Sequence, residues 1–549
     1  MTRVTGSTLL LLVIAGLPGS RGEADEASNP WRRGALRFYG FGLRELPLSD
    51  QRLADMGVNL VYGGAVYRLG TDLATRDLTE LKRLNAGRHA LGMRTMTGTS
   101  LVIVQQRWLD QYPNARNHIR LLPNGQPARW KDSPGKLTAC PRHPYWTEMH
   151  KRGLELAIEA GFDAAHLDNP HSLPCTCRLC RSAWREYARR IGRPGVDLET
   201  AANTQDRSLA VQYDIFRYRA MMEMLRRIKV CVKSIKPDFA LDFTAHLDPR
   251  SAYYWTFGRG GYDIICLELT TAQADWFPPE GESLVGYKVC YACSGNRPVW
   301  GLQKLLHRAQ RPRPKSIATA RDAEAYADDG APKGQLDPWV RSNPSADRER
   351  LYLAEALASE AMVAPVTLAQ HHAARWGTKS IPFSDIIRRY YQFMREHEDL
   401  YTDTESIANV AVVLSVKSWL WDRGLKQSLF GACEALLREH RLFDIVVAEK
   451  MRPGDLDRHD GIVLVRAACL DDRAIGIIER RVSAGAHLVL IGDNATLTGD
   501  FLPRRHTPPI FRTQHGGNTG NGRVRRLEGD AVGRRTTRPC PWPHASPDR

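Results

Sequence analysis

Residues 161–187 read GFDAAHLDNPHSLPCTCRLCRSAWREY, and this stretch decides the expected fold. Its first part, Phe162–Asn169, is a strand-like run of mostly small and apolar residues that closes in Asp168 and Asn169. A strand that is apolar along most of its length is typical of a parallel sheet buried on both faces. A carboxylate at the end of such a strand has to lie where the sheet meets solvent. We therefore expect a parallel α/β fold with a polar edge at Asp168.

Similar strand-like runs lie on both sides of this stretch, and helical segments separate them. Alternation of strands and helices predicts a parallel sheet with the helices outside it. Eight such units fit a (β/α)₈ TIM barrel, which we assign to residues 30–384. The expected barrel strands are Arg37–Leu43, Val58–Gly64, Met93–Ser100, Phe162–Asn169, Phe239–His246, Tyr262–Thr270, Arg297–Lys304 and Ala364–His371.

A second, smaller α/β unit is expected after a helical connector at residues 385–404. Buried strands with helices between them predict a doubly wound domain at residues 405–500. This unit has no glycine-rich phosphate loop, and Cys469 lacks the G-x-C-x-G turn of a cysteine nucleophile. We expect a structural or oligomer-forming domain. Its expected strands are Ile407–Ser415, Phe443–Val447, Asp460–Val465 and Ala486–Gly492.

The amino-terminal end has the pattern of a secretory signal peptide. Arg3 precedes an apolar run at Leu9–Leu17, and small residues follow up to Ala24. We expect residues 1–24 to be removed and the protein to be exported to the periplasm or the outside of the cell; an uncleaved anchor is the alternative. After removal we expect no membrane span, because no interior run reaches the roughly 18 apolar residues that a span needs.

The carboxy-terminal end carries much of the charge. The formal net charge is +16, and residues 501–549 contain ten arginines and only three acidic residues. This segment is poor in aliphatic periodicity, so we expect a basic, disordered tail. The rest of the chain has no basic run interleaved with aromatic residues, and we therefore expect no nucleic-acid partner.

Two acids close strands of the expected barrel, at the end where the βα loops of such a barrel form the active site. Cleavage of a glycosidic bond needs one carboxyl group as nucleophile and another as acid/base. We assign Asp168 as the nucleophile and Glu268 as the acid/base, which predicts retention of configuration; the alternative is that each is a salt-bridged acid at a strand end. Expected substrate-binding residues at the same ends are Tyr39, His166, Asn169, His246, Trp300, Gln303 and His371.

Three cysteines directly follow the fourth strand, as Cys175-Thr-Cys177-Arg-Leu-Cys180. Three thiols at this spacing can bind one tetrahedral zinc ion together with a distant fourth ligand. Cys140 is our first choice for that ligand, with His143 and His171 as others. A disulfide between Cys140 and one of the three is the alternative in an exported protein. A site with four sulfur ligands would be structural, because it leaves no position for water. We expect no organic cofactor.

Residues 161–187, with Cys140 upstream, resemble the fourth-strand region of family 42 glycoside hydrolases, the β-galactosidases. Residues 460–495 likewise resemble their amidotransferase-like trimerisation domain. The resemblance implies a carbohydrate substrate, a structural zinc ion and a homotrimer. It does not supply the catalytic pair, since Pro170 stands where that family carries its acid/base glutamate. An aspartate nucleophile on strand four is similar to the arrangement in α-galactosidase-like and α-L-fucosidase-like barrels.

These observations favour an exported glycoside hydrolase acting on oligo- or polysaccharides. A second hypothesis is a carbohydrate-binding barrel that has lost its catalytic acids, and Pro170 is the residue that supports it. A third is a metal-dependent hydrolase that uses His246, His371 and His372, although no H-x-H or H-E-x-x-H spacing supports it beyond the adjacent pair His371–His372.

Overall fold

A computed structural model describes residues 31–39, 48–63, 78–130, 135–269, 282–303, 346–363, 384–402, 404–512, 517–519 and 522–527. The expected signal peptide lies outside these residues. Within these ranges, no helix has both the length and the apolar character needed to cross a membrane.

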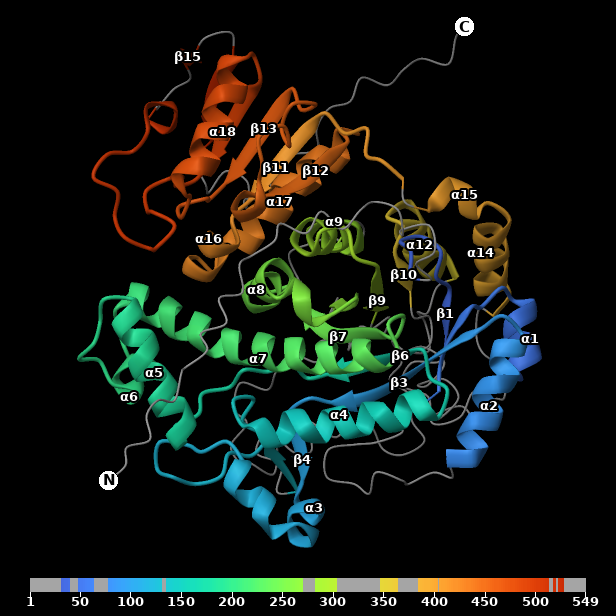
Figure 1. The fold of residues 1–549 in the computed structure, drawn as a ribbon. Coiled ribbons are helices and arrows are strands. Elements are labelled where there is room, and N and C mark those ends of the chain that lie inside the picture. Colours follow the sequence, from blue (N-terminus) through green and yellow to red (C-terminus); the bar gives the residue numbers. More distant parts are fainter. Residues whose placement is uncertain are drawn as a thin grey trace, which may run out of the picture. The chain divides into compact units, whose positions relative to one another are not determined.

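Eight parallel strands form one sheet in the order β1-β2-β3-β6-β7-β8-β9-β10 (Figure 1). Each strand contributes to one buried apolar cluster, from Phe38 on the first strand to Met362 on the last. The backbone N–H of Gly34 donates to the carbonyl of Glu360 at 3.0 Å, just before those two strands begin. The two edges of the sheet therefore come together here, and the sheet forms the expected TIM barrel, nearly closed in the part of the chain described. The strands are β1 (Phe38–Tyr39), β2 (Leu60–Tyr62), β3 (Arg94–Ser100), β6 (Ala164–Asp168), β7 (Ala240–His246), β8 (Ile264–Leu269), β9 (Val299–Gln303) and β10 (Met362–Val363).

Two barrel strands end or begin where the sequence did not predict. Strand β6 stops at Asp168, because Asn169 has a φ of 57° and turns the chain out of the extended conformation. The helix before the last strand ends at Ala358. Glu360 then has a φ of 53°, which starts the turn into β10. The expected eighth strand, Ala364–His371, lies outside the described residues.

Helices surround the barrel, and α2, α4 and α7 run along the outside of its strands (Figure 1). A hairpin of β4 (Ile103–Gln105) and β5 (Lys136–Thr138) lies in the long connection between β3 and β6, which the sequence did not predict. The helices of this part are α1 (Asp50–Asp55), α2 (Leu78–Ala90), α3 (Gln106–Gln111), α4 (Pro144–Glu159), α5 (Arg178–Arg190), α6 (Leu198–Ala202), α7 (Arg207–Ile235), α8 (Pro249–Phe257), α9 (Glu282–Ser294), α12 (Ala346–Ala358), α14 (Ser384–Glu396) and α15 (Glu398–Tyr401).

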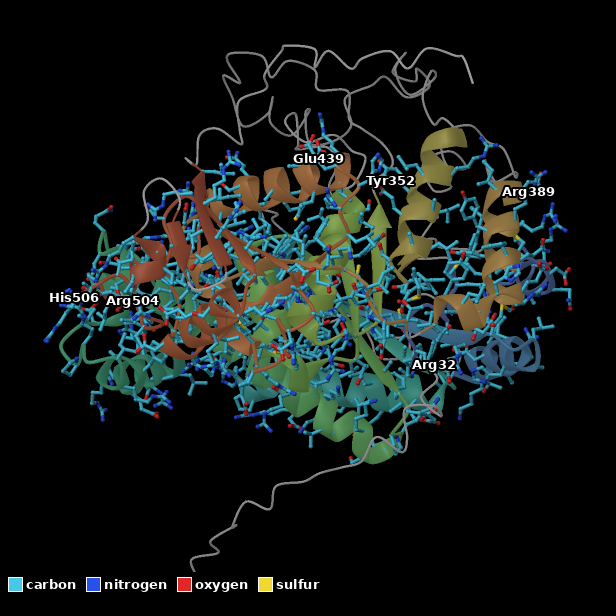
Figure 2. All side chains as sticks on the ribbon, turned by 90° about the horizontal axis from the view of Figure 1, so that it is seen from above. Arg32, Tyr352, Arg389, Glu439, Arg504 and His506 are labelled. Carbon is cyan, nitrogen blue, oxygen red and sulfur yellow. The ribbon has the colours of Figure 1, made fainter. Side chains whose placement is uncertain are left out.

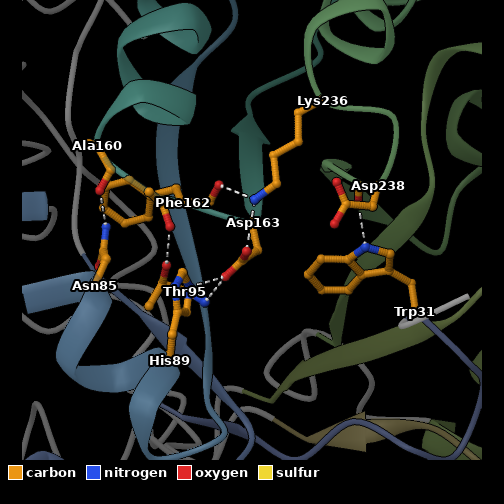
Figure 3. A network of polar contacts seen from close by, with 10 residues as sticks. Trp31, Asn85, His89, Thr95, Ala160, Phe162, Asp163, Lys236 and Asp238 are labelled. Atoms are coloured by element: carbon orange, nitrogen blue, oxygen red, sulfur yellow. Dashed lines mark hydrogen bonds and ion pairs between the residues drawn. The ribbon is translucent and has the colours of Figure 1, made fainter.

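An aspartate fixes the amino end of β6 (Figure 3). The Asp163 carboxylate accepts from the Thr95 backbone at 2.9 Å and from Lys236 at 2.9 Å, and His89 Nε2 lies 2.8 Å away. Burial acts to raise the pKa of Asp163, but the hydrogen bonds from Thr95 and Lys236 outweigh it and hold the pKa below its usual 3.8. This end of a TIM barrel serves stability rather than catalysis.

A second aspartate, one hundred residues later, makes the same kinds of contact at the amino end of β8. Asp263 accepts from the Leu241 backbone at 3.0 Å and pairs with Lys229 at 2.6 Å. Both aspartates stand five residues before a carboxylate at the other end of their strand, Asp168 or Glu268. The amino ends of the two strands are therefore anchored alike.

A second sheet has the order β12-β11-β13-β14-β16-β15, as expected of a doubly wound unit. Helix α18 packs on one face, where Ile478 and Val482 are buried. The elements are β11 (Val410–Leu414), α16 (Val416–Trp421), α17 (Leu425–Arg438), β12 (Phe443–Val447), β13 (Gly461–Val465), α18 (Asp472–Ser483), β14 (His487–Ile491), β15 (Gly517–Thr519) and β16 (Gly522–Leu527).

The prediction that the whole of residues 501–549 is a disordered tail is wrong. Strand β16 pairs in parallel with β14, and Val524 is buried between the exposed Arg523 and Arg525. Arg504, labelled with His506 in Figure 2, lies against this unit and bonds to Asp472 at 2.6 Å. We predicted disorder because the segment is rich in arginine, but a strand with one exposed face needs only every second residue to be apolar. The second unit therefore extends past residue 500.

Candidate active site and metal centre

The two predicted catalytic acids both face the inside of the barrel. Successive side chains of a strand point to opposite faces, so residues two apart share a face. Ala164 lies in the interior cluster, and Asp168 is four residues further along β6. Ile264 and Cys266 lie in the same cluster, and Glu268 follows two residues later on β8. Only β7 separates these strands, so both acids lie at the same end of the barrel interior.

Asp168 is half-buried and is held by the residue that follows it. One carboxylate oxygen accepts from the Asn169 backbone N–H at 2.7 Å, and the other accepts from the Asn169 side chain at 2.6 Å. The Asn169 amide also lies 3.4 Å from the Ser100 hydroxyl on β3. The left-handed conformation of Asn169 makes both contacts to Asp168 possible. The structure thus places Asn169 beside the predicted nucleophile.

Glu268 has a histidine as its neighbour. His246, at the end of β7, is in register with Glu268, and its Nδ1 lies 3.6 Å from a carboxylate oxygen. The side chain of His246 is 37% exposed and that of Glu268 is 17% exposed. Both side chains are therefore partly open to solvent at the carboxyl ends of their strands.

Two residues expected to bind substrate lie instead one layer below the acids. His166 and Trp300 are 1% and 0% exposed, and both bond to the Asp242 carboxylate. Neither has a free ring face that a sugar could reach. The polar groups of both rings are needed inside the barrel, where Asp242 requires hydrogen-bond donors.

Of the remaining predicted binding residues, only Tyr39 has a described side chain, and it does not lie at the mouth. Tyr39 is buried in the cluster between the strands and the helices, because on β1 it is Phe38 that faces inward. Gln303 ends β9, and its side chain is not among those described. His371 lies outside the described residues, as does His372 of the alternative metal site.

Sequence reasoning missed two inward-facing residues of β7, Asp242 and Thr244. Asp242 is fully buried, and Thr244 is 4% exposed. The signal was present, because an acid in the middle of the apolar run Ala240–His246 alternates in step with His246. Tyr62 on β2 was also missed; it packs against the interior cluster, and Gly98 on β3 leaves room for its hydroxyl.

The four predicted metal ligands converge. The sulfur atoms of Cys140, Cys175, Cys177 and Cys180 all lie within 4.8 Å of one another, and none forms a disulfide. Cys140 Sγ lies 3.8 Å from Cys177 Sγ and 3.7 Å from Cys180 Sγ. A tetrahedral zinc ion with Zn–S bonds of about 2.3 Å places its sulfurs about 3.8 Å apart. The cluster can therefore hold a metal ion, and Cys140 rather than His143 or His171 completes it.

Two arginines lie beside this cluster. Burial lowers the pKa of Arg142, and the thiols of all four cysteines oppose that effect. The positive charge of Arg142 therefore lies near the cluster. Its guanidinium lies 4.0 Å over the Phe216 ring. Arg120 donates to Thr138 and to the Pro174 carbonyl, each at 2.9 Å. Four thiolates around a divalent ion carry a net charge of minus two, which the two neighbouring guanidinium groups can balance.

The second unit offers no comparable site among its described residues. Cys469 is buried, and burial raises its pKa to about 12, so its thiol stays protonated. Glu449 accepts from the backbone of Val416 and Lys417 at 3.1 and 2.8 Å and from Ser415 at 2.9 Å. Its carboxylate thus fills the carboxyl end of β11, where a doubly wound fold would bind a ligand.

No protein-family model matches the chain, and no curated protein matches it. Among solved structures it is similar to a GH42 β-galactosidase from G. stearothermophilus, with 12% identity, a TM-score of 0.60, and coverage of 83% of this chain and 70% of that one. The β-galactosidase of Halorubrum lacusprofundi gives 13% identity and a TM-score of 0.65, covering 90% and 88%.

The α-L-fucosidase isoenzyme 2 of Paenibacillus thiaminolyticus is also similar, with 16% identity and a TM-score of 0.53, covering 85% of this chain and 65% of that one. These matches confirm, at the level of fold, the resemblance seen in residues 161–187. The chain therefore has the fold of the GH42 β-galactosidases, a TIM barrel with a second α/β unit, at only 11–14% sequence identity.

Proposed function

We propose that this protein is a retaining glycoside hydrolase in which Asp168 is the nucleophile and Glu268 the acid/base. The observation that carries the proposal is the shared orientation of these two acids. Both stand at the carboxyl end of an inward-facing row of a TIM barrel, with one strand between them. That is the end at which TIM-barrel enzymes do their chemistry.

In the proposed reaction, Glu268 donates a proton to the glycosidic oxygen as the Asp168 carboxylate attacks the anomeric carbon. The bond to the leaving group breaks, and a covalent glycosyl–Asp168 ester forms. Glu268 then removes a proton from water, which attacks the same carbon and releases Asp168 as a carboxylate. The two displacements restore the original configuration. The contacts from Asn169 orient Asp168, and His246 Nδ1 lies 3.6 Å from a carboxylate oxygen of Glu268.

A non-catalytic carbohydrate-binding barrel is the second candidate. Pro170 replaces the glutamate that the resemblance would lead one to expect, and both oxygens of Asp168 accept hydrogen bonds from Asn169. A carboxylate held in this way could bind and orient a sugar as well as it could attack one. Both candidates bind carbohydrate, but only the hydrolase turns it over.

A panel of 4-nitrophenyl glycosides that includes the β-D-galactoside and the α-L-fucoside tests the choice. We expect hydrolysis of at least one, and a loss in kcat/KM of about 10²–10⁴-fold in Asp168→Asn and in Glu268→Gln. Glu186→Gln, an exposed acid on α5, is the matched control and retains full activity. Azide should restore turnover of the Asp168 variant by replacing the missing nucleophile. Sugar binding by the wild type without hydrolysis of any substrate would favour the second candidate.

We further propose that the cysteine cluster binds a structural zinc ion. The sulfur spacing supports this, because the four sulfur atoms all lie within 4.8 Å of one another. Cys140 belongs to the connection that carries the β4–β5 hairpin, and the other three follow β6. The ion would tie these two loops together, and it would take no part in the reaction.

Export and oligomerisation complete the proposal. The signal-peptide pattern at residues 1–24 supports export, and the second α/β unit supports a homotrimer by its resemblance to a trimerisation domain. Mass spectrometry of the secreted protein and light scattering of the purified one test these two statements separately.

A further inference from the structure

Three side chains from different connections of the barrel lie in a row near the proposed acids. The rings of Trp130 and His171 have their centroids 5.0 Å apart and are tilted by 49° to each other. The guanidinium group of Arg250 donates a hydrogen bond to Nδ1 of the same imidazole. Arg250 also donates to the Asp248 carboxylate at 3.1 Å. We call Trp130, His171 and Arg250 the rim row.

The row begins beside the proposed nucleophile. His171 is three residues after Asp168, and its backbone N–H donates to the Asn169 carbonyl at 2.7 Å. Trp130 belongs to the connection between β3 and β6, and its backbone N–H donates at 3.0 Å to the carbonyl of Lys136, the first residue of β5. Both side chains thus come from connections that follow the carboxyl ends of strands. Such connections surround the mouth of a TIM barrel.

The other end of the row lies beside the proposed acid/base. Arg250 is next to Ser251, whose hydroxyl accepts from the backbone N–H of His246 at 3.2 Å. His246 is in register with Glu268 and ends β7, the strand between β6 and β8. The row therefore extends along the mouth from the connection after β6 to the connection after β7.

The contacts hold the row in a defined arrangement. A guanidinium group has no acceptor atom, so Nδ1 of His171 must accept from Arg250, and the proton of a neutral ring is then on Nε2. The Asp248 carboxylate that binds Arg250 also accepts from the Ser251 backbone N–H at 2.7 Å, at the start of α8. Side chains that are ordered before a ligand arrives lose little conformational entropy when it binds.

Trp130 differs from the other tryptophans of the barrel. It contacts the main core, but its side chain is partly exposed. A partly exposed indole offers an apolar ring at the surface and so can pack against a ligand. The other barrel tryptophans whose side chains the structure describes are at most 5% exposed: Trp31, Trp108, Trp146, Trp184, Trp255 and Trp300.

The chemistry of the row fits a neutral sugar. A pyranose has an apolar face of C–H groups and hydroxyl groups at its edge. Sites for such ligands combine aromatic rings with a few well-placed polar side chains. Arg250 is paired with Asp248, so the row carries little net charge. It is therefore better suited to neutral hydroxyl groups than to a phosphate or a carboxylate.

The barrel interior below the two acids is filled. His166 and Trp300 are 1% and 0% exposed, so a sugar bound at Asp168 and Glu268 cannot extend deeper into the barrel. Its leaving group must then point outward. An outward leaving group passes over the connections around the mouth, where the rim row lies.

We propose that the rim row binds the leaving group, and that it selects glycosides whose leaving group is itself a ring, as the second sugar of an oligosaccharide is. Trp130 packs against that ring, and His171 and Arg250 orient its hydroxyl groups. This inference rests on the proposed function and names the substrate class for it.

Two substrates of the same sugar test the proposal: the 4-nitrophenyl glycoside that the panel identifies, and the corresponding glycosyl fluoride. Fluoride leaves as a single ion and is too small to reach the row. In Trp130→Ala we expect the ratio of kcat/KM for the 4-nitrophenyl glycoside to kcat/KM for the fluoride to fall about tenfold, the size of one lost aromatic contact. Trp130→Phe keeps a ring and should recover most of that ratio.

Tyr112→Ala is the matched control, because Tyr112 is an exposed aromatic residue of the same β3–β6 connection outside the row. It should leave the ratio unchanged. If Trp130→Ala lowers kcat/KM equally for both substrates, Trp130 acts only through the fold and the proposal is wrong.

Binding of analogues that are not cleaved separates this inference from the proposed function, because it needs no turnover. Calorimetry compares the 4-nitrophenyl 1-thioglycosides of the panel sugars with their methyl glycosides. We expect the wild type to bind a thioglycoside about tenfold more tightly than its methyl glycoside, and Trp130→Ala to bind the two alike. If this holds but no glycoside is hydrolysed, the proposed function fails and the rim row remains a sugar-binding site. Equal affinities in the wild type, or no binding of any thioglycoside, would overturn the inference.

Discussion

Asp163 shows how much a single residue can contribute at the end of the barrel away from the site. Its carboxylate is 15% exposed and faces both Lys236 and His89. We expect Asp163→Asn to lower the midpoint of thermal unfolding by about 3–6 °C at pH 7, because it leaves a half-buried lysine without its partner. Thermal unfolding followed by circular dichroism measures the change.

The effect has a defined pH dependence. The pKa of Asp163 is lower in the folded state than its usual 3.8, so its stabilisation is complete above about pH 4 and disappears as the pH falls through the folded value. The difference between wild type and Asp163→Asn should therefore shrink at acid pH. Asp460→Asn, an exposed acid 78% open to solvent, is the control and should change little at any pH. A difference that stays constant down to pH 2 would contradict this account.

Residue types were predicted better than residue positions. Asp168, Asn169, His246 and Glu268 could be predicted because a polar group at a strand end has to lie at the barrel mouth. Tyr39 and Trp300 could not, since facing in or out depends on the register of each strand, and a shift of one residue reverses it. The same uncertainty hid Asp242, whose place in the interior became clear only from its bonds to His166 and Trp300.

At the scale of elements, β16 is the strand that an arginine-rich composition concealed. Val524 is 2% exposed and lies in register with Leu488 on β14. We expect Val524→Asp to bury an unpaired charge and to detach this edge of the second sheet, which limited proteolysis would detect as cleavage after residue 500. Arg523→Asp on the exposed side of the same strand is the matched control. Equal protease resistance in both variants would show that β16 is not part of the sheet.

The cysteine cluster joins two elements that are distant in sequence. If it holds zinc, metal analysis should find one ion per chain, and chelation should lower the midpoint of unfolding by roughly 10 °C. Cys177→Ser should lose the ion and show the same loss of stability without chelator. Cys231→Ser, a free cysteine on α7 outside the cluster, should keep the ion. An unchanged midpoint after complete removal of metal would contradict a structural role.

At the scale of the molecule, the order of strands and helices was enough to predict both units. Apolar strands such as Phe239–His246 and Ile407–Ser415 were clear because parallel sheets bury both faces. The carboxy-terminal limit of the second unit was not predicted, because β16 alternates arginine with apolar residues. The hairpin β4–β5 was missed since its strands are three residues long, too short for a period to show.

The account as a whole depends on the distance between the carboxyl groups of Asp168 and Glu268. A crystal structure of the protein would measure it directly. The retaining mechanism predicts about 5–5.5 Å. A separation of about 6.5–9.5 Å would replace retention by inversion. Carboxyl groups much further apart, or a Glu268 that points away from the barrel mouth, would contradict the proposed catalytic pair.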